Sequence, residues 1–354
     1  MEGSRRDFLK EVGALGAMAA IGELSLCAAG KPEGMQSSRI PQFQIDHVTA
    51  AGRSLRQMQD SLASFGLKTE NGGPHSNHAT EMALLSFPDG SYLELIGLQQ
   101  NPDPKAIAAH YWSKFLQADA GPCAWAVQVP DVSAEAQRFS SLGIAVTTPA
   151  KNGRTRMDGV QLDWDFARVG PGPNGTFFPF LIRDLTPRAY RVYPSGKPTM
   201  TAYRGISKVV IAVKDMGNSV QLYQRAYNLP APMTQDDSDF GAKLAWFKGT
   251  PVILAAPSSD KSPLAGRIAQ FGDARVLSSW QRQKNIRSPP CLFVQSGLGS
   301  RFPGLIPPSL VGAWESSRRC HVRQVVTKST KNERSSRLQT ISLLFVAGVE
   351  CDNN

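Results

Sequence analysis

The stretch IDHVTAAGRSLRQMQDSLASFGLKT, residues 45–69, returns twice in altered form along the 354-residue chain. The second copy is AWAVQVPDVSAEAQRFSSLGIAVTT, residues 124–148, and the third is SKVVIAVKDMGNSVQLYQRAYNLPAP, residues 207–232. Each copy contains a short apolar segment, a Ser or Asp, an amphipathic segment and a Gly or Asn. Recurrence of one plan at this length indicates repeated structural units.

The spacing inside each copy predicts a strand followed by a helix. The candidate N-caps are Ser54, Asp131 and Asp215, and the candidate turn residues, 12, 12 and 13 positions later, are Gly66, Gly143 and Asn228. Ser and Asp side chains accept hydrogen bonds from the first turn of a helix, and Gly and Asn tolerate the positive φ that often ends one. In the first copy Leu55, Met58 and Leu62 fall on one apolar stripe with Phe65.

Strand-like runs follow each predicted helix. The first copy is followed by ATEMALLSF (79–87) and SYLELIGL (91–98), joined by the turn PDG. The second is followed by GVQLDWDFARV (159–169) and TFFPFLI (176–182), and the third by KLAWFKG (243–249) and TPVILAAP (250–257). Apolar runs bounded by Gly, Pro and Asp are typical of strands. The sequence therefore predicts an α+β protein built on a β-α-β-β-β plan that occurs three times.

This plan, with the motifs IDHVTAA, DGSYLELIGL, RMDGVQLDW and FFPFLI, resembles the vicinal oxygen chelate superfamily and, within it, the glyoxalase-like domain proteins. The resemblance implies paired βαβββ modules whose curved mixed sheets enclose a cleft. It implies a glyoxalase-like domain of two modules over residues 43–185, a linker over 186–202, and a third module over 203–272 as half of a second, apparently incomplete domain. Residues 103–117 are expected to form an additional helix between the first two modules.

The residues after the third module differ in composition from the rest. Residues 273–354 contain 12 Lys and Arg against 5 Asp and Glu, and so account for +7 of the net charge of +10. Polar, basic tracts with few aromatic residues do not bury enough surface to order themselves, so we expect a poorly ordered tail, which is native, divergent or frame-altered. The rest of the chain has no basic stripe, and a nucleic-acid partner is not expected.

The N-terminus carries SRRDFLK, residues 4–10, before a weakly apolar run that ends near Cys27. This order of charged and apolar residues is typical of an export signal, and the motif resembles the bacterial twin-arginine translocation signal. The resemblance implies a cleaved signal peptide over residues 1–30, the twin-arginine export machinery as a partner, and a periplasmic or secreted protein. An ordinary amphipathic helix and a lipoprotein cleavage site at LSLC are weaker alternatives. The apolar run is shorter than the roughly 20 residues that span a bilayer, and no stable membrane span is expected.

The resemblance also implies a possible divalent metal site, its identity unknown. In metal-using members of the superfamily, His or Gln near the start of a module's first strand and Glu on its fourth strand bind the ion. The first module has His47 and Glu94 at these positions. An offset of 77 residues places Ala124 of the second module at the position of His47, and its last strand, FFPFLI, places Phe180 at that of Glu94; the third module has Lys208 and Ile253 at the equivalent places. A four-ligand glyoxalase I site is therefore not expected. The alternatives for the first pair are a histidine bonded to a backbone carbonyl and a glutamate paired with an arginine.

Other residues are candidates for the same cleft. His75 or His78, in the loop GGPHSNHAT, would complete a metal site if the loop folds over it, and loop histidines are more often simply solvated. The arginine of RMDG, Arg156, matches the glyoxalase-like pattern and could bind a substrate carboxylate, the alternative being a turn stabilised by its own residues. Trp164 could line the cleft with Phe180 or fill the core. His110, beside Tyr111, is expected to pack.

Two functions follow from these residues. The first is an exported enzyme that acts on a small oxygenated molecule as a lyase, isomerase or dioxygenase, with Glu94 as the proton-transferring group. The second is a non-catalytic module that binds a small apolar ligand against Trp164 and Phe180, and a scaffold with an open sheet edge is a third, weaker reading. The sequence contains no dinucleotide, P-loop, zincin or nucleophile-elbow motif, and those chemistries lack their geometry here.

Overall fold

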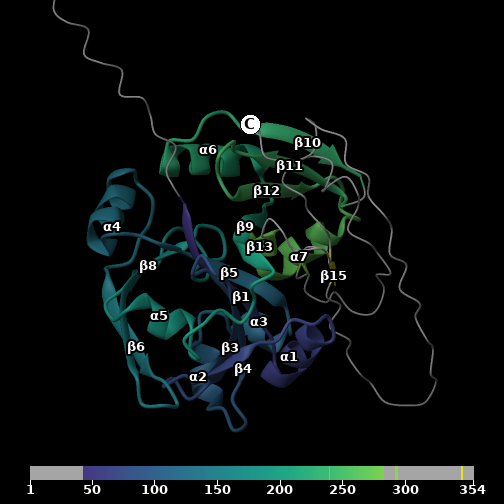
Figure 1. The fold of residues 1–354 in the computed structure, drawn as a ribbon. Coiled ribbons are helices and arrows are strands. Elements are labelled where there is room, and N and C mark those ends of the chain that lie inside the picture. The colour runs from purple at the N-terminus through teal and green to yellow at the C-terminus, as the bar shows by residue number, and fades with distance from the viewer. Residues whose placement is uncertain (1–42, 239, 283–291, 294–343, 346–354) are drawn as a thin grey trace, which may run out of the picture. The chain divides into compact units, whose positions relative to one another are not determined.

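A computed structural model describes residues 43–238, 240–282, 292–293 and 344–345 (Figure 1). The predicted signal peptide and most of the predicted tail lie outside these residues. The first module comprises β1 (Gln44–Ala51), α1 (Leu55–Ala63), β2 (Glu70–Pro74), β3 (Thr80–Ser86) and β4 (Tyr92–Leu98). The second comprises β5 (Gly121–Gln128), α4 (Val132–Ser141), β6 (Ala150–Thr155), β7 (Gln161–Ala167) and β8 (Phe180–Asp184), and is followed by α5 (Arg188–Val192).

The two modules form one eight-stranded mixed sheet in the order β2-β3-β4-β1-β5-β8-β7-β6. The first strands, β1 and β5, pair antiparallel at its centre, and each also pairs in parallel with the last strand of its own module. The sheet is therefore symmetric about the β1–β5 pair, as a repeated βαβββ plan requires. The fold predicted for residues 43–185 is confirmed.

The helix boundaries follow the predicted capping residues. The side chains of Ser54, Asp131 and Asp215 accept hydrogen bonds from the backbone N–H groups of Gln57, Ala134 and Asn218, at 3.2, 3.0 and 2.9 Å. The predicted turn residues Gly66, Gly143 and Asn228 all adopt positive φ, of 78°, 67° and 50°. Local chemistry thus determines where the three repeated helices begin and end.

The segment between the first two modules forms two short helices, α2 (Pro104–Ala109) and α3 (Ser113–Gln117), where one helix was predicted. The chain leaves the helical conformation at His110, whose ψ is 133°, and the Nδ1 atom of this residue accepts a hydrogen bond from the backbone N–H of Trp112. A side chain that bonds to the backbone offers an alternative to the next helical turn, which explains the break.

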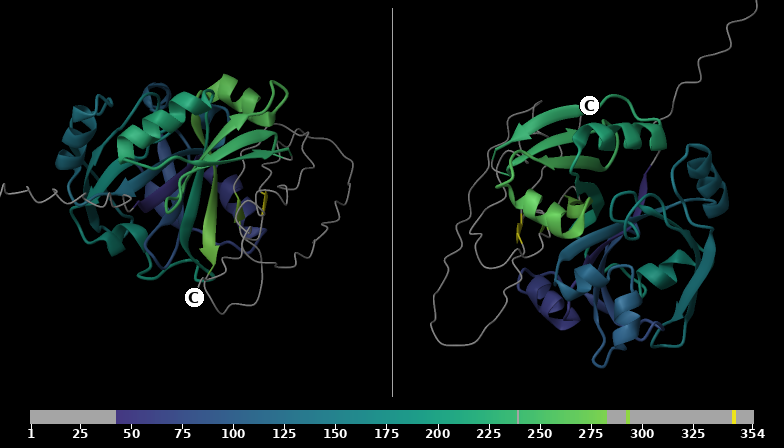
Figure 2. Two further views of the ribbon diagram at one scale, coloured as in Figure 1. Left: turned by 90° about the horizontal axis from the view of Figure 1, so that it is seen from above. Right: turned by 180° about the vertical axis from the view of Figure 1, so that it is seen from behind.

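The third module comprises β9 (Tyr203–Ala212), α6 (Met216–Tyr227), β10 (Met233–Asp237), β11 (Ala242–Trp246) and β12 (Val252–Pro257), followed by α7 (Pro263–Phe271) and β13 (Ala274–Arg282). These strands form a second sheet in the order β10-β11-β12-β9-β13. Both α6 and α7 contact β12, and Figure 2 shows these elements from two further sides. The strands β14 (Leu292–Phe293) and β15 (Leu344–Phe345) pair with each other.

The strand β13 corrects the boundary that the sequence predicted at Asp273. It pairs antiparallel with β9, as β5 pairs with β1 in the first sheet. The second sheet therefore contains one full module and, at its edge, the strand with which a fourth module would begin. This strand was not predicted, because its sequence ARVLSSWQR has no clear alternation of apolar and polar residues.

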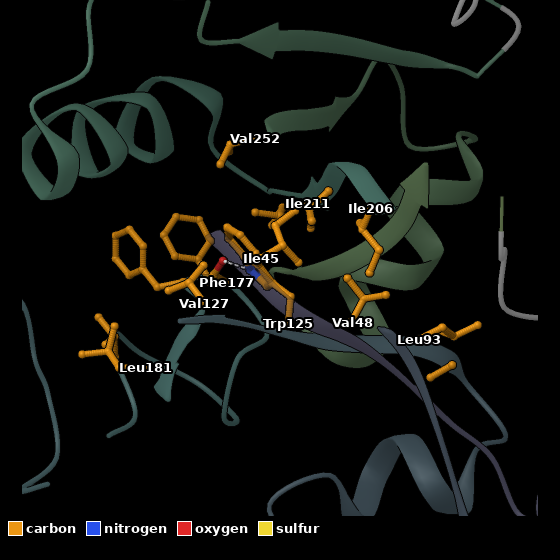
Figure 3. Packing of buried hydrophobic residues seen from close by; sticks show 14 of the residues in the cluster. Ile45, Val48, Leu93, Trp125, Val127, Phe177, Leu181, Ile206, Ile211 and Val252 are labelled. Atoms are coloured by element: carbon orange, nitrogen blue, oxygen red, sulfur yellow. Dashed lines mark hydrogen bonds between the residues drawn. The ribbon is translucent and has the colours of Figure 1, made fainter. Parts of the chain in front are cut away.

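One large apolar core includes side chains from both sheets (Figure 3). Ile45 and Val48 of β1 belong to it with Ile206 and Ile211 of β9, and Trp125 of β5 is completely buried there. The indole of Trp125 donates a hydrogen bond of 3.2 Å to the backbone carbonyl of Phe177. This core uses one face of the first sheet, so the opposite face, which carries His47 and Glu94, remains for a site. No helix in the described part of the chain is long and apolar enough to cross a membrane.

Candidate functional site

A cavity of about 160 Å³ lies on the face of the first sheet that the large core does not use. Side chains of β1, β3, β4, β6, β7 and β8 line it, together with the loop that carries His75 and the segment that carries His110. Of the candidates predicted from the sequence for this cleft, five line the cavity, namely His47, His75, Glu94, Trp164 and Phe180. The structure thus brings together the candidate ligands of the first module and the apolar residues of the second.

The imidazole of His47 lies between two carboxylates. Its Nδ1 atom bonds to the carboxylate of Asp46, and its Nε2 atom is 3.7 Å from Oε2 of Glu94. That same oxygen of Glu94 accepts a hydrogen bond of 3.1 Å from the hydroxyl of Thr49. The sequence suggested a backbone carbonyl as the partner of His47 and an arginine as the partner of Glu94. In the structure the partner of His47 is Asp46 and that of Glu94 is Thr49.

An irregularity in β1 explains how Asp46 reaches the neighbouring ring. The pairing of β1 with β5 shifts register between Ile45 and His47, so Asp46 has no partner in the ladder. On a regular strand consecutive side chains point to opposite faces, and a bulge changes this direction locally. The bulge lets the carboxylate of Asp46 meet the ring of His47 on the cavity side of the sheet.

Asp46 is completely buried and is held by two arginines. Nη1 and Nη2 of Arg191 donate to its two oxygens at 2.9 and 2.8 Å, Arg188 donates as well, and Gln128 adds a bond of 2.6 Å. Burial would raise the pKa of Asp46, but the charge of Arg191, the bond with His47 and the charge of Arg188 outweigh it and hold that pKa well below its usual value. An ionised carboxylate only accepts, so Nδ1 of His47 carries a proton and Nε2 faces Glu94.

The same cluster neutralises its own charges. Arg191 also donates to Asp184 through Nε at 2.6 Å and Nη2 at 2.8 Å, and to the hydroxyl of Tyr92 at 2.7 Å. Its two carboxylates, Asp46 and Asp184, balance Arg188 and Arg191. The ring of Tyr92 stacks on that of His47 at 4.8 Å, which fixes the ring plane. This network holds His47 in one orientation without leaving net charge of its own in the cavity.

The strand registers confirm which residues correspond in the three modules. Thr49 pairs with Glu94 in the first module, Ala126 with Phe180 in the second, and Val210 with Ile253 in the third. In the antiparallel pairing of β1 with β5, His47 lies opposite Ala126 and Thr49 lies opposite Ala124. Since Ala126 is the counterpart of Thr49, the same symmetry makes Ala124 the counterpart of His47. Phe180 and Ile253 therefore occupy the position of Glu94, as their places in the last strands of their modules predicted.

The metal-donor set consists of two groups. His47 and Glu94 can both direct a donor atom into the cavity, and across the described residues no three His, Cys, Asp or Glu side chains gather in a way that could hold a metal ion. An imidazole nitrogen and a carboxylate oxygen fit a divalent first-row transition ion that would take its remaining ligands from water or substrate. They do not fit a closed tetrahedral site, which needs four protein ligands.

His78 does not line the cavity. It is exposed, with φ of 55°, whereas His75 lines the cavity and bonds through Nδ1 to the hydroxyl of Thr80 at 2.8 Å. Of the two candidate histidines in this loop, the structure places His75, and not His78, in the cavity wall. His110 also lines the cavity, in addition to the packing predicted for it. Burial lowers the pKa of His75, and burial together with the neighbouring His75 lowers the pKa of His110 to about 4.

Arg156 also lies away from the cavity. It donates to the backbone carbonyls of Tyr190, at 2.9 Å, and Pro194, at 2.6 Å, and forms an ion pair with Asp158. These contacts tie the β6–β7 hairpin to the segment around α5. Arg156 thus stabilises local structure, as the alternative reading of the sequence had it. It does not line the cavity, where the resemblance had placed it.

Arg154, two residues before Arg156, lines the cavity together with Arg191, and neither arginine was predicted from the sequence. In the β6–β7 hairpin Arg154 pairs with Leu162 and Asn152 pairs with Trp164, so these residues share a face. Combining the alternation of LDWDF with the register of the hairpin could have identified Arg154. Asn174, which also lines the cavity and was not predicted, comes from the loop before β8 and has no such signal.

The second module adds aromatic side chains to the other side of the cavity, beside the polar Arg154 and Asn174. Phe180 contacts the ring of His47 edge-on at 5.2 Å between centroids, and Trp164 and Phe166 line the cavity from β7. Trp164 is half-buried, and so serves as cavity wall as well as packing against the core beneath. The arrangement can place an apolar part of a ligand against aromatic rings while its polar part faces His47 and Glu94.

Comparison with solved structures finds similar folds at low identity. A hypothetical protein from Staphylococcus aureus is 16% identical, with a TM-score of 0.49, covering 61% of this chain and 86% of its own. A mutant of 4-hydroxymandelate synthase from Streptomyces coelicolor is 12% identical, with a TM-score of 0.43 and coverages of 66% and 69%. A variant of methylmalonyl-CoA epimerase from the same organism is 18% identical, with a TM-score of 0.31 and coverages of 41% and 97%.

Sequence comparison is decisive for the family. No curated protein matches the chain significantly. The model of the glyoxalase-like domain family matches residues 45–227, which is more than half of the chain and includes both modules around the cavity. The chain therefore belongs to the glyoxalase-like domain family.

Proposed function

We propose that the protein is an enzyme that acts on a small oxygenated organic molecule in this cavity, and that Glu94 transfers a proton in the reaction. One observation carries the proposal: His47 and Glu94 converge to 3.7 Å in a cavity whose opposite side carries the aromatic rings of Trp164, Phe166 and Phe180. A carboxylate in such surroundings, beside a fixed imidazole, is suited to general acid–base chemistry. The reaction class is that of a lyase, isomerase or dioxygenase.

The residues around Glu94 and His47 have different roles in the proposed reaction. Thr49 bonds to Oε2 of Glu94 and orients the carboxylate, while Asp46 and Arg191 hold His47 so that Nε2 faces the same space. Glu94 would take or return a proton at a carbon or oxygen of the substrate, and His47 would bond to a neighbouring oxygen. A divalent ion bound by His47 and Glu94 would polarise adjacent substrate oxygens as a Lewis acid.

Exchange of substrate hydrogen for solvent deuterium tests the proposal. The purified protein is incubated in D₂O with a panel of small hydroxyketones and keto acids, including hydroxyacetone and pyruvate, with and without Mn²⁺, and the probes are followed by NMR. Exchange above the uncatalysed rate is expected for at least one probe, and Glu94→Gln should reduce it by about 10²- to 10⁴-fold. Equal exchange in Glu94→Gln would refute the role of Glu94.

A non-catalytic binding module is the second candidate. The observation that favours it is the loss of a carboxylate in the second module, where Phe180 stands in place of a counterpart to Glu94. With Trp164 and Phe166 it gives half of the cavity an aromatic lining suited to an apolar ligand. Absence of catalysed exchange with every probe, together with binding of benzene-sized apolar compounds, would favour this function.

We further propose that the chain is exported by the twin-arginine machinery and acts in the periplasm or outside the cell. The motif SRRDFLK at residues 4–10, before a short apolar run, supports this. Changing Arg5 and Arg6 together to Lys should leave the protein in the cytoplasm with its leader uncleaved, as cell fractionation and mass spectrometry would show. Normal export of this variant would remove the assignment.

A further inference from the structure

Two buried polar atoms in the cavity wall have no hydrogen-bond partner. They are Nη2 of Arg154, on β6, and Oδ1 of Asn174, in the loop before β8. The residues are only 7% and 5% exposed, and both line the cavity. A buried polar group without a partner costs free energy, and native proteins keep few of them. Two in one cavity wall indicate that a ligand supplies the missing partners.

Arg154 is the cation whose charge the protein leaves open to this cavity. Its Nη1 atom donates to the backbone carbonyl of Gly72, which fixes the guanidinium, and it forms no ion pair within the described residues. By contrast, Arg191, the other arginine in the wall, donates to Asp46, Asp184 and Tyr92. Burial lowers the pKa of Arg154, and the charges of Tyr92 and Glu94 only partly oppose this. A buried, fixed and unpaired guanidinium is suited to a carboxylate.

Asn174 requires the complementary partner. Its backbone carbonyl accepts a hydrogen bond of 2.8 Å from the indole of Trp112, so its backbone is held in place. The side-chain Oδ1 atom is an acceptor, and it therefore needs a donor such as a hydroxyl group. The ligand must present an anionic oxygen to Arg154 and a hydroxyl to Asn174.

The size of the cavity limits the rest of the ligand. A volume of about 160 Å³ is close to that of an engineered protein cavity, about 150 Å³, that binds benzene. A ligand of on the order of six to ten non-hydrogen atoms would fit such a space. The carboxylate and the hydroxyl are therefore carried on a short carbon body that reaches from Arg154 toward Glu94 and His47.

We propose that the cavity binds a small hydroxylated carboxylate, with its carboxylate on Arg154 and its hydroxyl donating to Asn174. This assignment rests on the proposed function, because it names the substrate class of the same site. It replaces the role that the sequence suggested for Arg156. It also gives Glu94 a substrate whose carbon body lies between two fixed polar ends.

Equilibrium binding to three matched probes tests the assignment. Lactate carries both groups, propionate lacks the hydroxyl, and lactamide lacks the charge. Calorimetric titration of the whole protein should show that lactate binds at least tenfold more tightly than lactamide, and more tightly than propionate. Equal affinity for lactate and lactamide, or binding of neither, would overturn the proposal.

Variants of Arg154 and Asn174 test which residue binds the carboxylate of lactate and which binds its hydroxyl. Arg154→Gln should reduce lactate affinity about tenfold or more, to the level of lactamide, and Asn174→Ala should reduce it to the level of propionate. Arg156→Gln, on the same hairpin but outside the cavity, is the matched control and should keep the wild-type affinity. Loss of lactate binding in Arg156→Gln but not in Arg154→Gln would contradict the assignment. Thermal unfolding of each variant verifies that it is folded.

A further variant separates this inference from the proposed function. Glu94→Gln should bind lactate at least as tightly as the wild type, since it removes a negative charge from the cavity. If proton exchange is the same in Glu94→Gln and the wild type while lactate still binds more tightly than propionate and lactamide, the proposed reaction fails and the ligand class stands. If exchange depends on Glu94 but the three probes bind alike, the ligand class fails and the reaction stands.

Discussion

The two halves of the cavity have the same backbone and opposite chemistry. In the first module His47 and Glu94 face the cavity, with Thr49 bonded to the glutamate. In the second module the corresponding residues are Ala124 and Phe180, and the strand pairs Thr49–Glu94 and Ala126–Phe180 show the correspondence directly. A repeated fold thus keeps its register at these positions, while only the first copy places a histidine and a glutamate there and the second places an alanine and an aromatic ring. The predictions below test that division.

The largest loss of stability is expected from removing Arg191, which holds the Asp46 carboxylate that bonds to His47. Arg191→Leu should reduce the free energy of unfolding by about 3–5 kcal/mol, because it leaves the buried carboxylates of Asp46 and Asp184 without their main partner. Urea unfolding measures this change. Arg156→Leu, which breaks an ion pair with the half-exposed Asp158, is the control and should cost clearly less. Equal losses would mean that the buried network does not stabilise the site.

A smaller effect is expected from the cavity histidines. The pKa of His110 is lowered to about 4, mainly by burial, while an unfolded histidine titrates near 6.5. Between these values the unfolded chain binds more protons than the folded one, so stability should fall as the pH drops from about 6.5 to 4. His110→Gln should flatten this part of the curve of unfolding free energy against pH. His78→Gln, at an exposed position, should leave it unchanged, and a slope unaffected by His110→Gln would contradict the assignment.

The smallest change in the free energy of unfolding is expected from removing the N-cap of one helix in each module. Ser54→Ala, Asp131→Ala and Asp215→Ala each remove one N-cap hydrogen bond, and each should reduce the unfolding free energy by about 1 kcal/mol. Separate urea titrations of the three variants measure the losses. Similar values would show that the modules share their local folding rules although they differ in chemistry. A negligible loss in all three would mean that packing alone determines these helix starts.

Much of this arrangement could be predicted from the sequence because it depends on local or periodic features. Caps and turns are determined within a few residues, and the position of the last strand in each copy identified Phe180 and Ile253 as counterparts of Glu94. The strand registers later confirmed these correspondences.

The missed features depend on contacts that no periodicity encodes. Arg191 meets Asp46 across 145 residues, and a bulge in β1 directs Asp46 toward His47. The loop with two histidines presents His75 to the cavity and not His78, because its turn geometry selects one of them. The strand β13 was missed because it lies at the sheet edge and lacks an alternating pattern.

Calorimetric titration with Mn²⁺ tests most directly whether the reactive groups lie in the first module alone. The account predicts weak binding to the wild-type protein, since the part of the chain that the structure describes offers two ligands, and no detectable binding to His47→Ala or Glu94→Gln. His78→Ala is the matched control, because its side chain is exposed and outside the cavity, and it should bind as the wild type does. Unchanged affinity in His47→Ala, or loss of binding in His78→Ala alone, would contradict the account.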